Sequence, residues 1–176
     1  FTLTKLAGEL GISKKDLQSG TIRLPAYRAL YLDHILKEGP GITYYRDQLF
    51  KSMVRAVKTV EDSDEPVPAR FEAILREYQK TGFRWMKTLD KCGFGGILAD
   101  DMGLGKTIQV IALFEDTYSS GEKAPSLVVC PASLVYNWEQ EIQKFAPDLK
   151  VRSVVGTGPQ RLELLEKIKE DPSGCQ

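Results

Sequence analysis

The sequence predicts an α/β protein with a parallel sheet, preceded by an all-helical segment. Beyond about residue 65, apolar runs typical of buried strands alternate with runs of helical periodicity. A glycine-containing turn, Gly103-Leu104-Gly105-Lys106-Thr107, separates the first predicted strand from the helix that follows it. Earlier in the chain only helical patterns occur, so we divide it into residues 1–65 and residues 66–176.

The first segment, residues 1–65, is predicted to be a helical accessory segment. Helical patterns cover residues 5–20, 24–38 and 42–60. The last of these places Leu49, Met53, Val57 and Val60 on one apolar stripe, with its basic side chains largely off that stripe. The acidic, proline-bearing run EDSDEPVP follows and is typical of a linker.

The second segment, residues 66–176, alternates between the two kinds of pattern. Strands are predicted at Ile97–Ala99, Ser126–Cys130 and Val151–Val155. Helices are predicted before the first strand, after each of the first two, and from Thr157 onward. Strand, helix, strand, helix, strand is the order expected of a doubly wound α/β fold.

The glycine-containing turn has the chemistry of a phosphate site. Glycines let the backbone approach phosphate oxygens, and N–H groups at a helix N-terminus bind them. Lys106 would add a positive charge at the β- and γ-phosphates, and the Thr107 hydroxyl suits Mg²⁺. Asp100 stands where the general P-loop has a glycine, so the turn fits the helicase version, G-x-G-K-T, better than the kinase version. Asp100 and Asp101 are expected to cap and polarise the helix.

The composition argues against some classes of protein but does not assign a function. Twenty-four basic residues balance 24 acidic ones, so nucleic-acid binding would need a local basic patch. No two of the three cysteines form a C-x-x-C motif, which argues against a zinc site and against a disulfide framework. With no signal peptide and no apolar run long enough for a membrane span, the sequence favours a cytoplasmic protein with no membrane partner.

Three motifs then match one family in order and spacing. LREYQKTGFRWM, Leu75–Met86, resembles the glutamine motif of superfamily-two helicase-like ATPases, and ILADDMGLGKTIQ resembles their first motif. VVCPASLVYNWEQEIQKFAP, Val128–Pro147, resembles the next motif of the Swi/Snf-type branch, the double-stranded DNA translocases similar to chromatin remodellers. RLPAYRALYLDHIL resembles the helical segment that precedes the ATPase in bacterial members.

This resemblance implies that residues 66–176 are the first part of an N-terminal RecA-like lobe, truncated before the acidic Walker B-type box. It implies an ATPase that uses ATP and Mg²⁺ and moves on double-stranded DNA, with a second ATPase lobe of the same chain outside this sequence. The fragment alone is therefore expected to be inactive. If the protein is bacterial, it is expected to be nucleoid-associated.

The resemblance also assigns site residues. Gln79 would read the adenine edge, and Lys106 and Thr107 would act in catalysis, with Thr107 on Mg²⁺. The full nucleotide-binding set would be Arg76, Gln79, Asp101, Met102, Gly103, Leu104, Gly105, Lys106 and Thr107. A DNA phosphate would bind the loop of Pro131, Ala132, Ser133 and Leu134 through the backbone N–H groups of its non-proline residues, although Ser133 could instead cap the following helix.

Two other interpretations compete. Residues 5–20 resemble a helix-turn-helix, which would make the chain a non-catalytic DNA-binding module with a degenerate nucleotide fold. Against this, its second helix is short and runs into Gly20. A different P-loop enzyme, such as a kinase, is the third interpretation, and Asp100 and the adjoining motifs argue against it.

Overall fold

The computed structural model describes residues 7–8, 11–13, 15, 18, 24–38, 43–59, 63–121 and 124–170. Most of the helix-turn-helix predicted over residues 5–20 lies outside this part of the chain. The described elements are helical: η1 (Ala26–Arg28), α3 (Ala29–Glu38), α4 (Gln48–Lys58), α5 (Ala69–Glu72), α6 (Glu77–Lys91), α7 (Lys106–Ser119), η3 (Ala132–Leu134), α8 (Val135–Phe145) and α9 (Gly158–Glu170). None of these helices is long and apolar enough to cross a membrane.

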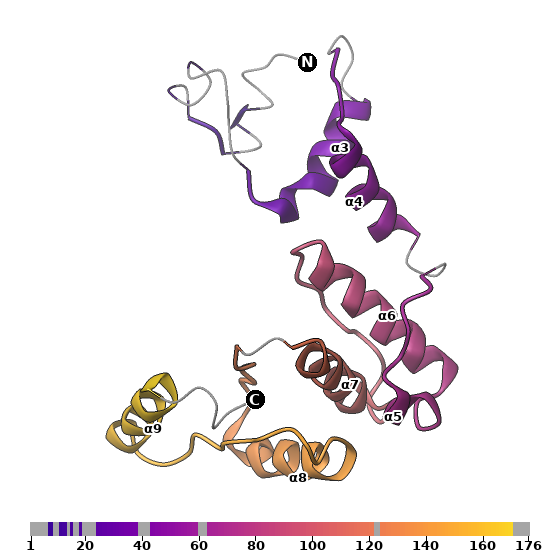
Figure 1. Ribbon diagram of the computed structural model, residues 1–176. Coiled ribbons are helices and arrows are strands. Elements are labelled where there is room, and N and C mark those ends of the chain that lie inside the picture. The colour runs from indigo at the N-terminus through magenta and orange to yellow at the C-terminus, as the bar shows by residue number, and fades with distance from the viewer. Residues whose placement is uncertain are drawn as a thin grey trace. The chain divides into compact units, whose positions relative to one another are not determined.

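The predicted parallel sheet is wrong for this structure, and with it the partial RecA-like lobe. No strand occurs among the described residues, and the three segments predicted as strands have no regular secondary structure (Figure 1). Ile97, Leu127 and Val129 are 86%, 78% and 85% exposed. A parallel strand is stable only when neighbouring strands satisfy its backbone groups and helices cover both faces. An apolar run shows that a segment can be buried in a sheet, but not that the neighbours are in place.

The chain forms two compact units, which we describe separately. The first unit comprises residues 1–63 and 88–97, and the second comprises residues 64–87 and 98–176. In the second unit, helices α6, α7 and α8 share one hydrophobic core. Phe71, Phe83 and Ile111 are completely buried in it, and Ile142 and Ala146 line it from α8 and its end. Packing in this core fixes the position of the N-terminus of α7, where the glycine-containing turn ends.

A second close contact in this unit joins a glycine of α6 to an amide side chain of α7. Gln109 of α7 is completely buried, and a Cβ atom on Gly82 of α6 would overlap its Oε1. Glycine is unfavourable within a helix by about 1 kcal/mol relative to alanine. Here a Cβ atom would force the buried Gln109 amide to move, so the close approach of α6 and α7 favours glycine.

In the first unit, α3 packs against α4. Ala29, Ile35 and Val54 are buried, whereas Leu49 is 77% exposed. Met53 and Val57 of the predicted stripe are half-buried, so the stripe is wrong at Leu49, and the buried face of α4 passes through Val54 instead. Asp47 begins α4, because its Oδ1 accepts a hydrogen bond from the Phe50 N–H at 2.7 Å.

A buried carboxylate lies between these two helices. Asp33 has a side chain only 1% exposed, and it accepts hydrogen bonds from Lys37 at 2.8 Å, from Lys58 at 3.1 Å and from Arg46. Burial by itself would raise the pKa of Asp33, but these three hydrogen bonds lower it from 3.8 to about 2. The ionised carboxylate therefore ties α3 to α4 and to the segment before α4.

We predict that Asp33 stabilises the first unit at neutral pH and not in acid. Because its pKa is lower in the folded state, its contribution is complete above the unfolded value of 3.8 and is lost as the pH falls toward about 2. A shift of this size corresponds to roughly 2 kcal/mol at pH 7. Urea unfolding followed by circular dichroism should show Asp33→Asn less stable than wild type by this amount at pH 7, with the difference closing at pH 2. The control is Asp47→Asn, which keeps a good helix cap and should change little.

We also predict that Gly82→Ala destabilises the second unit, contrary to ordinary helix propensity. The added methyl group must displace the buried Gln109 amide, and such overpacking costs about 1–3 kcal/mol. Thermal unfolding of Gly82→Ala, Gln109→Ala and the double variant measures the coupling. The second substitution should relieve the first. Gly158→Ala, where nothing lies within 4 Å of the new methyl group, is the matched control. Additive effects in the double variant would contradict the proposed overlap.

Candidate nucleotide-binding site

The glycine-containing turn leads directly into α7 and has the backbone conformation that its glycines predict. Gly103 and Gly105 have φ values of +84° and +76°, in the left-handed region that favours glycine. Gly105 is the residue before the helix, and no side chain caps the α7 N-terminus. The first N–H groups of a helix lack partners within it, so this terminus can donate hydrogen bonds to an anion.

Lys106 lies on the first turn of α7 and its side chain folds back over the turn. Its Nζ donates to the backbone carbonyl oxygens of Asp100, at 2.8 Å, and Asp101, at 2.9 Å. The structure thus holds the ammonium group beside the helix N-terminus, using neutral acceptors. Phosphate oxygens, being charged, would be stronger acceptors for the same group.

Gln79 on α6 joins the predicted glutamine motif to the turn. Its side chain is buried, with Oε1 accepting from the Arg76 N–H at 2.9 Å and Nε2 donating to the Leu104 carbonyl oxygen at 2.9 Å. A Cβ atom on Gly105 would lie 2.5 Å from Gln79 Nε2. The close approach of Gln79 therefore gives Gly105 a second reason to be glycine, beyond its positive φ.

Two further residues of this site were missed by sequence reasoning. Tyr78, which lies within the predicted glutamine motif, is 40% exposed, and its hydroxyl donates to the same Leu104 oxygen at 3.0 Å. Gln109 donates from Nε2 to Asp100 Oδ2 at 2.9 Å and reaches the Gly105 carbonyl oxygen at 3.4 Å. The available signal for Gln109 was its spacing, because a residue four positions beyond Gly105 returns to the same face of the helix.

The remaining predicted nucleotide-binding residues lie at the surface around this turn. Asp101 and Gly103 are exposed, Met102 is 96% exposed, and Thr107 is partly buried. The Arg76 side chain is also exposed, while its backbone N–H is bonded to Gln79. The expected capping of α7 by Asp100 does not occur, since the Asp100 carboxylate accepts from Gln109 instead.

The predicted DNA-contacting loop forms the short helix η3 before α8. Pro131, Ala132, Ser133 and Leu134 are all exposed. The Leu134 N–H donates to the Pro131 carbonyl oxygen at 2.9 Å. Ser133 does not cap α8, because the residue at that helix start is Leu134 and no side chain bonds to it. The loop therefore presents backbone donors at a helix start without a side-chain acceptor over them.

Comparison with known proteins matches two family models to successive parts of the chain. The SNF2-related domain matches residues 78–172, and the bacterial SNF2 helicase-associated family matches residues 1–68. Among curated relatives, a protein of Mycoplasma pneumoniae named as an ATP-dependent helicase is 41% identical over 167 residues, covering 89% of this chain and 16% of that protein. The protein named ATP-dependent helicase/translocase YwqA, of Bacillus subtilis, is 44% identical over 123 residues, covering 69% of this chain and 13% of its own length.

Solved structures of other proteins are also similar to this chain. The SWI2/SNF2 ATPase core of Sulfolobus solfataricus, in complex with double-stranded DNA, is 58% identical over 43% of this chain and 16% of that chain, with a TM-score of 0.42. The chain thus spans less than a fifth of each of these three proteins. The family predicted from the three motifs is confirmed: the chain belongs to the SNF2-related family of helicase-like proteins, with a bacterial SNF2 helicase-associated segment at residues 1–68.

Proposed function

We propose that this chain is the ATP-binding part of an ATP-dependent DNA translocase, in which ATP hydrolysis drives movement along double-stranded DNA. The observation that carries the proposal is the turn Gly103–Thr107 at the uncapped start of α7, hydrogen-bonded to Gln79. The motifs and the helicase names of the relatives support the same conclusion. We also propose a cytoplasmic location, which agrees with the absence of a disulfide at the two described cysteines, Cys92 and Cys130.

The phosphates of ATP would lie against the α7 N-terminus. Lys106 would leave the carbonyl oxygens of Asp100 and Asp101 and bind phosphate oxygens, since a charged acceptor gives the stronger hydrogen bond. Little rearrangement is needed, because the ammonium already lies within the turn. Its charge would then oppose the negative charge that develops on the transferred phosphoryl group.

The residues present also fit a magnesium ion that arrives with the nucleotide. Mg²⁺ takes oxygen ligands and commonly uses only one or two protein groups, with phosphates and waters completing the shell. Among the described residues, no three His, Cys, Asp or Glu side chains converge as an independent metal site. Thr107 would provide a hydroxyl oxygen beside the phosphates, and the metal would supply charge neutralisation there.

Gln79 can hold the turn and still read adenine. Its amide oxygen has two lone pairs and its amide nitrogen two hydrogens, and the structure uses one of each, toward Arg76 and Leu104. One acceptor and one donor remain, which match the N6 amino group and the N7 nitrogen of adenine. Guanine presents an acceptor, O6, where adenine has its amino group, so the same amide would favour ATP over GTP.

We predict that ATP binding by the 176-residue chain is weak, with a Kd in the ~mM range, or about −4 kcal/mol. Lys106→Ala should weaken it at least about tenfold, because a hydrogen bond to a charged group contributes about 1.5–3 kcal/mol. Nuclear magnetic resonance titration with ATP and Mg²⁺ measures both values. Lys169→Ala on α9 removes the same charge away from the turn and should leave binding unchanged. Equal losses in both variants would contradict the assigned role of Lys106.

The same titration, repeated with GTP, tests Gln79. The substitution Gln79→Ala should weaken the binding of ATP more than the binding of GTP.

For DNA, we predict that η3 binds a phosphate through backbone N–H groups. Ala132→Pro removes one such donor and fits the local geometry, because Pro131 has the extended conformation (φ −54°, ψ 143°) required of a residue before proline. Duplex affinity, measured by fluorescence anisotropy on several sequences, should fall about tenfold for this variant on every sequence. Ala132→Ser keeps the N–H and is the control. An effect confined to one base sequence would instead favour base-edge reading.

A further inference from the structure

We infer that the α3–α4 pair is a second contact surface for the phosphate backbone of duplex DNA, separate from η3. The basic surface comprises Arg46, Lys51, Arg55 and Lys58 of the α4 region together with Lys37 of α3. The choice of DNA as the anion rests on the proposed function, whereas the existence of an anion-attracting surface rests on the charges described below.

The charge of this surface is locally unbalanced although the chain as a whole is neutral. Three cations, Lys37, Arg46 and Lys58, converge on the single carboxylate of Asp33, so that in the described part of the chain three positive charges share one negative charge. Asp33 is buried beneath them, while the Lys37 and Lys58 side chains remain 45% and 55% exposed. The carboxylate therefore fixes the cations in place without neutralising the surface that faces solvent.

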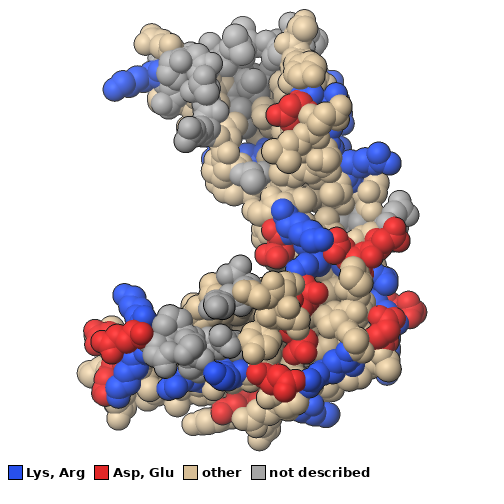
Figure 2. Space-filling view, viewed as in Figure 1, with Lys and Arg blue, Asp and Glu red and all other residues tan. Residues whose placement is uncertain are grey.

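The basic surface continues as a row of three side chains along α4. Lys51, Arg55 and Lys58 are spaced by four and three residues, so they lie on one side of the helix, and Lys51 and Arg55 are exposed. A helix rises 1.5 Å per residue, so the row extends roughly 10 Å, about three base-pair steps along a duplex. Figure 2 shows Lys and Arg side chains on the surface of this part of the chain. The exposed acidic group at the start of α4, Asp47, is engaged as the helix cap.

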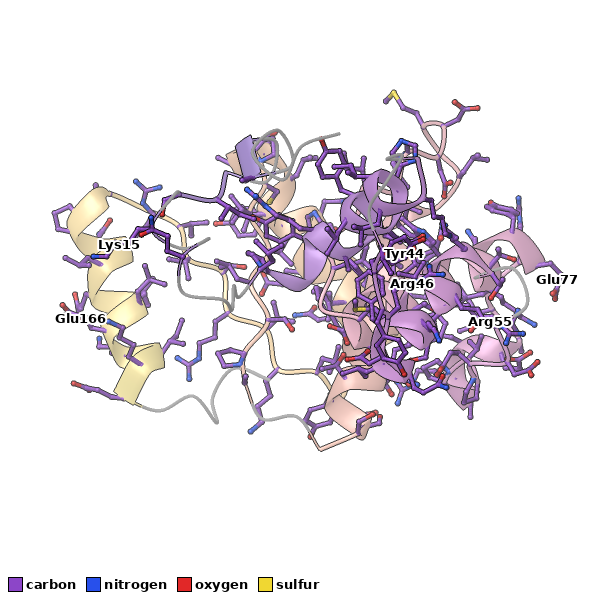
Figure 3. The ribbon with its side chains drawn as sticks, turned by 90° about the horizontal axis from the view of Figure 1, so that it is seen from above. Lys15, Tyr44, Arg46, Arg55, Glu77 and Glu166 are labelled. Carbon is purple, nitrogen blue, oxygen red and sulfur yellow. The ribbon has the colours of Figure 1, made fainter. Side chains whose placement is uncertain are left out.

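Aromatic rings are interleaved with these cations. The Arg46 guanidinium lies 5.5 Å from the centre of the Tyr44 ring, and Lys51 Nζ lies 5.7 Å from the centre of the Tyr45 ring. The Tyr45 side chain is 89% exposed. Figure 3 shows Tyr44, Arg46 and Arg55 on this part of the chain. Tyrosine hydroxyls are common partners of DNA phosphates, so cations and rings together form a surface suited to a sugar-phosphate backbone.

A solvated basic face is the ordinary explanation for charges on one helix. It accounts for Lys51 and Arg55, but it does not account for three cations drawn to one buried carboxylate. Such convergence brings like charges together, and an anion placed over it is attracted by the excess. Since phosphate contacts of this kind carry no base information, the surface would position the duplex without selecting its sequence.

The experiment is duplex binding by the whole 176-residue chain at several salt concentrations, followed by fluorescence anisotropy. In the double variant Lys51→Gln/Arg55→Gln, both side chains are exposed and outside the Asp33 cluster, so the fold should be retained, as circular dichroism will verify. The expected result is at least about tenfold weaker binding at low salt, and a slope of log K against log salt that is shallower by about 2, for two lost phosphates. The matched control is Arg161→Gln/Lys169→Gln on α9, which changes the net charge equally and should bind as wild type.

Each other outcome is decisive. Unchanged affinity and slope in Lys51→Gln/Arg55→Gln, with wild type still binding DNA, overturns this inference and leaves the proposed function intact. Equal weakening in the α9 control overturns it as well, because bulk charge would explain the result. A wild-type chain that binds no DNA overturns this inference and the role of η3, whereas the ATP-binding role of the turn is tested separately by the ATP titration. Preference for single strands over duplex, lost in the double variant, would overturn the assignment to duplex and assign the rings to base stacking.

Discussion

The site depends on one contact, the approach of the Gln79 amide to the backbone at Leu104 and Gly105. The amide donates to the Leu104 carbonyl oxygen, and no Cβ atom can be placed on Gly105 without meeting it. This contact ties α6 to the turn just where α7 begins. Because the hydrophobic core of Phe83 and Ile111 holds α6 and α7 together, a side chain at the edge of that core determines where the turn lies.

The turn is held from a second side by Gln109 and Asp100. Gln109 is buried against Gly82 and bonds to the Asp100 carboxylate, while Lys106 bonds to the carbonyl oxygen of the same aspartate. Gln109 Oε1 accepts no hydrogen bond from the described part of the chain. A buried acceptor without a partner is costly, so we regard this contact as a constraint accepted for close helix packing. The two glutamines thus hold the turn from both flanks, and the glycines make both approaches possible.

In the first unit, too, a buried polar side chain holds neighbouring elements together, but here the interaction is between charges and not between amides and backbone groups. Asp33 is buried and joins three cations from two helices and the segment between them, which stabilises the pair and concentrates positive charge on its surface. This concentration of positive charge could not be predicted from the net charge of zero, because charge balance in a sequence does not tell which side chains share a face. One ionised carboxylate thereby supports both the packing of α3 on α4 and the surface proposed to meet DNA.

What the sequence determined by itself was chemistry and local structure. The order of residues from Gly103 to Thr107 predicted the turn and the helix after it, and the three motifs together predicted the family, because each motif depends on near neighbours along the chain. It also predicted α8, which starts beside Leu134, and α9, which starts at Gly158. Only the tertiary structure decided whether the apolar runs at Ile97, Leu127 and Val129 form a sheet, and it showed that they do not. Strand pairing requires distant partners, whereas a helix satisfies its own backbone. The roles of Gln109, Tyr78 and Asp33 belong to the same class, since each depends on residues that the fold, and not the chain order, brings into contact.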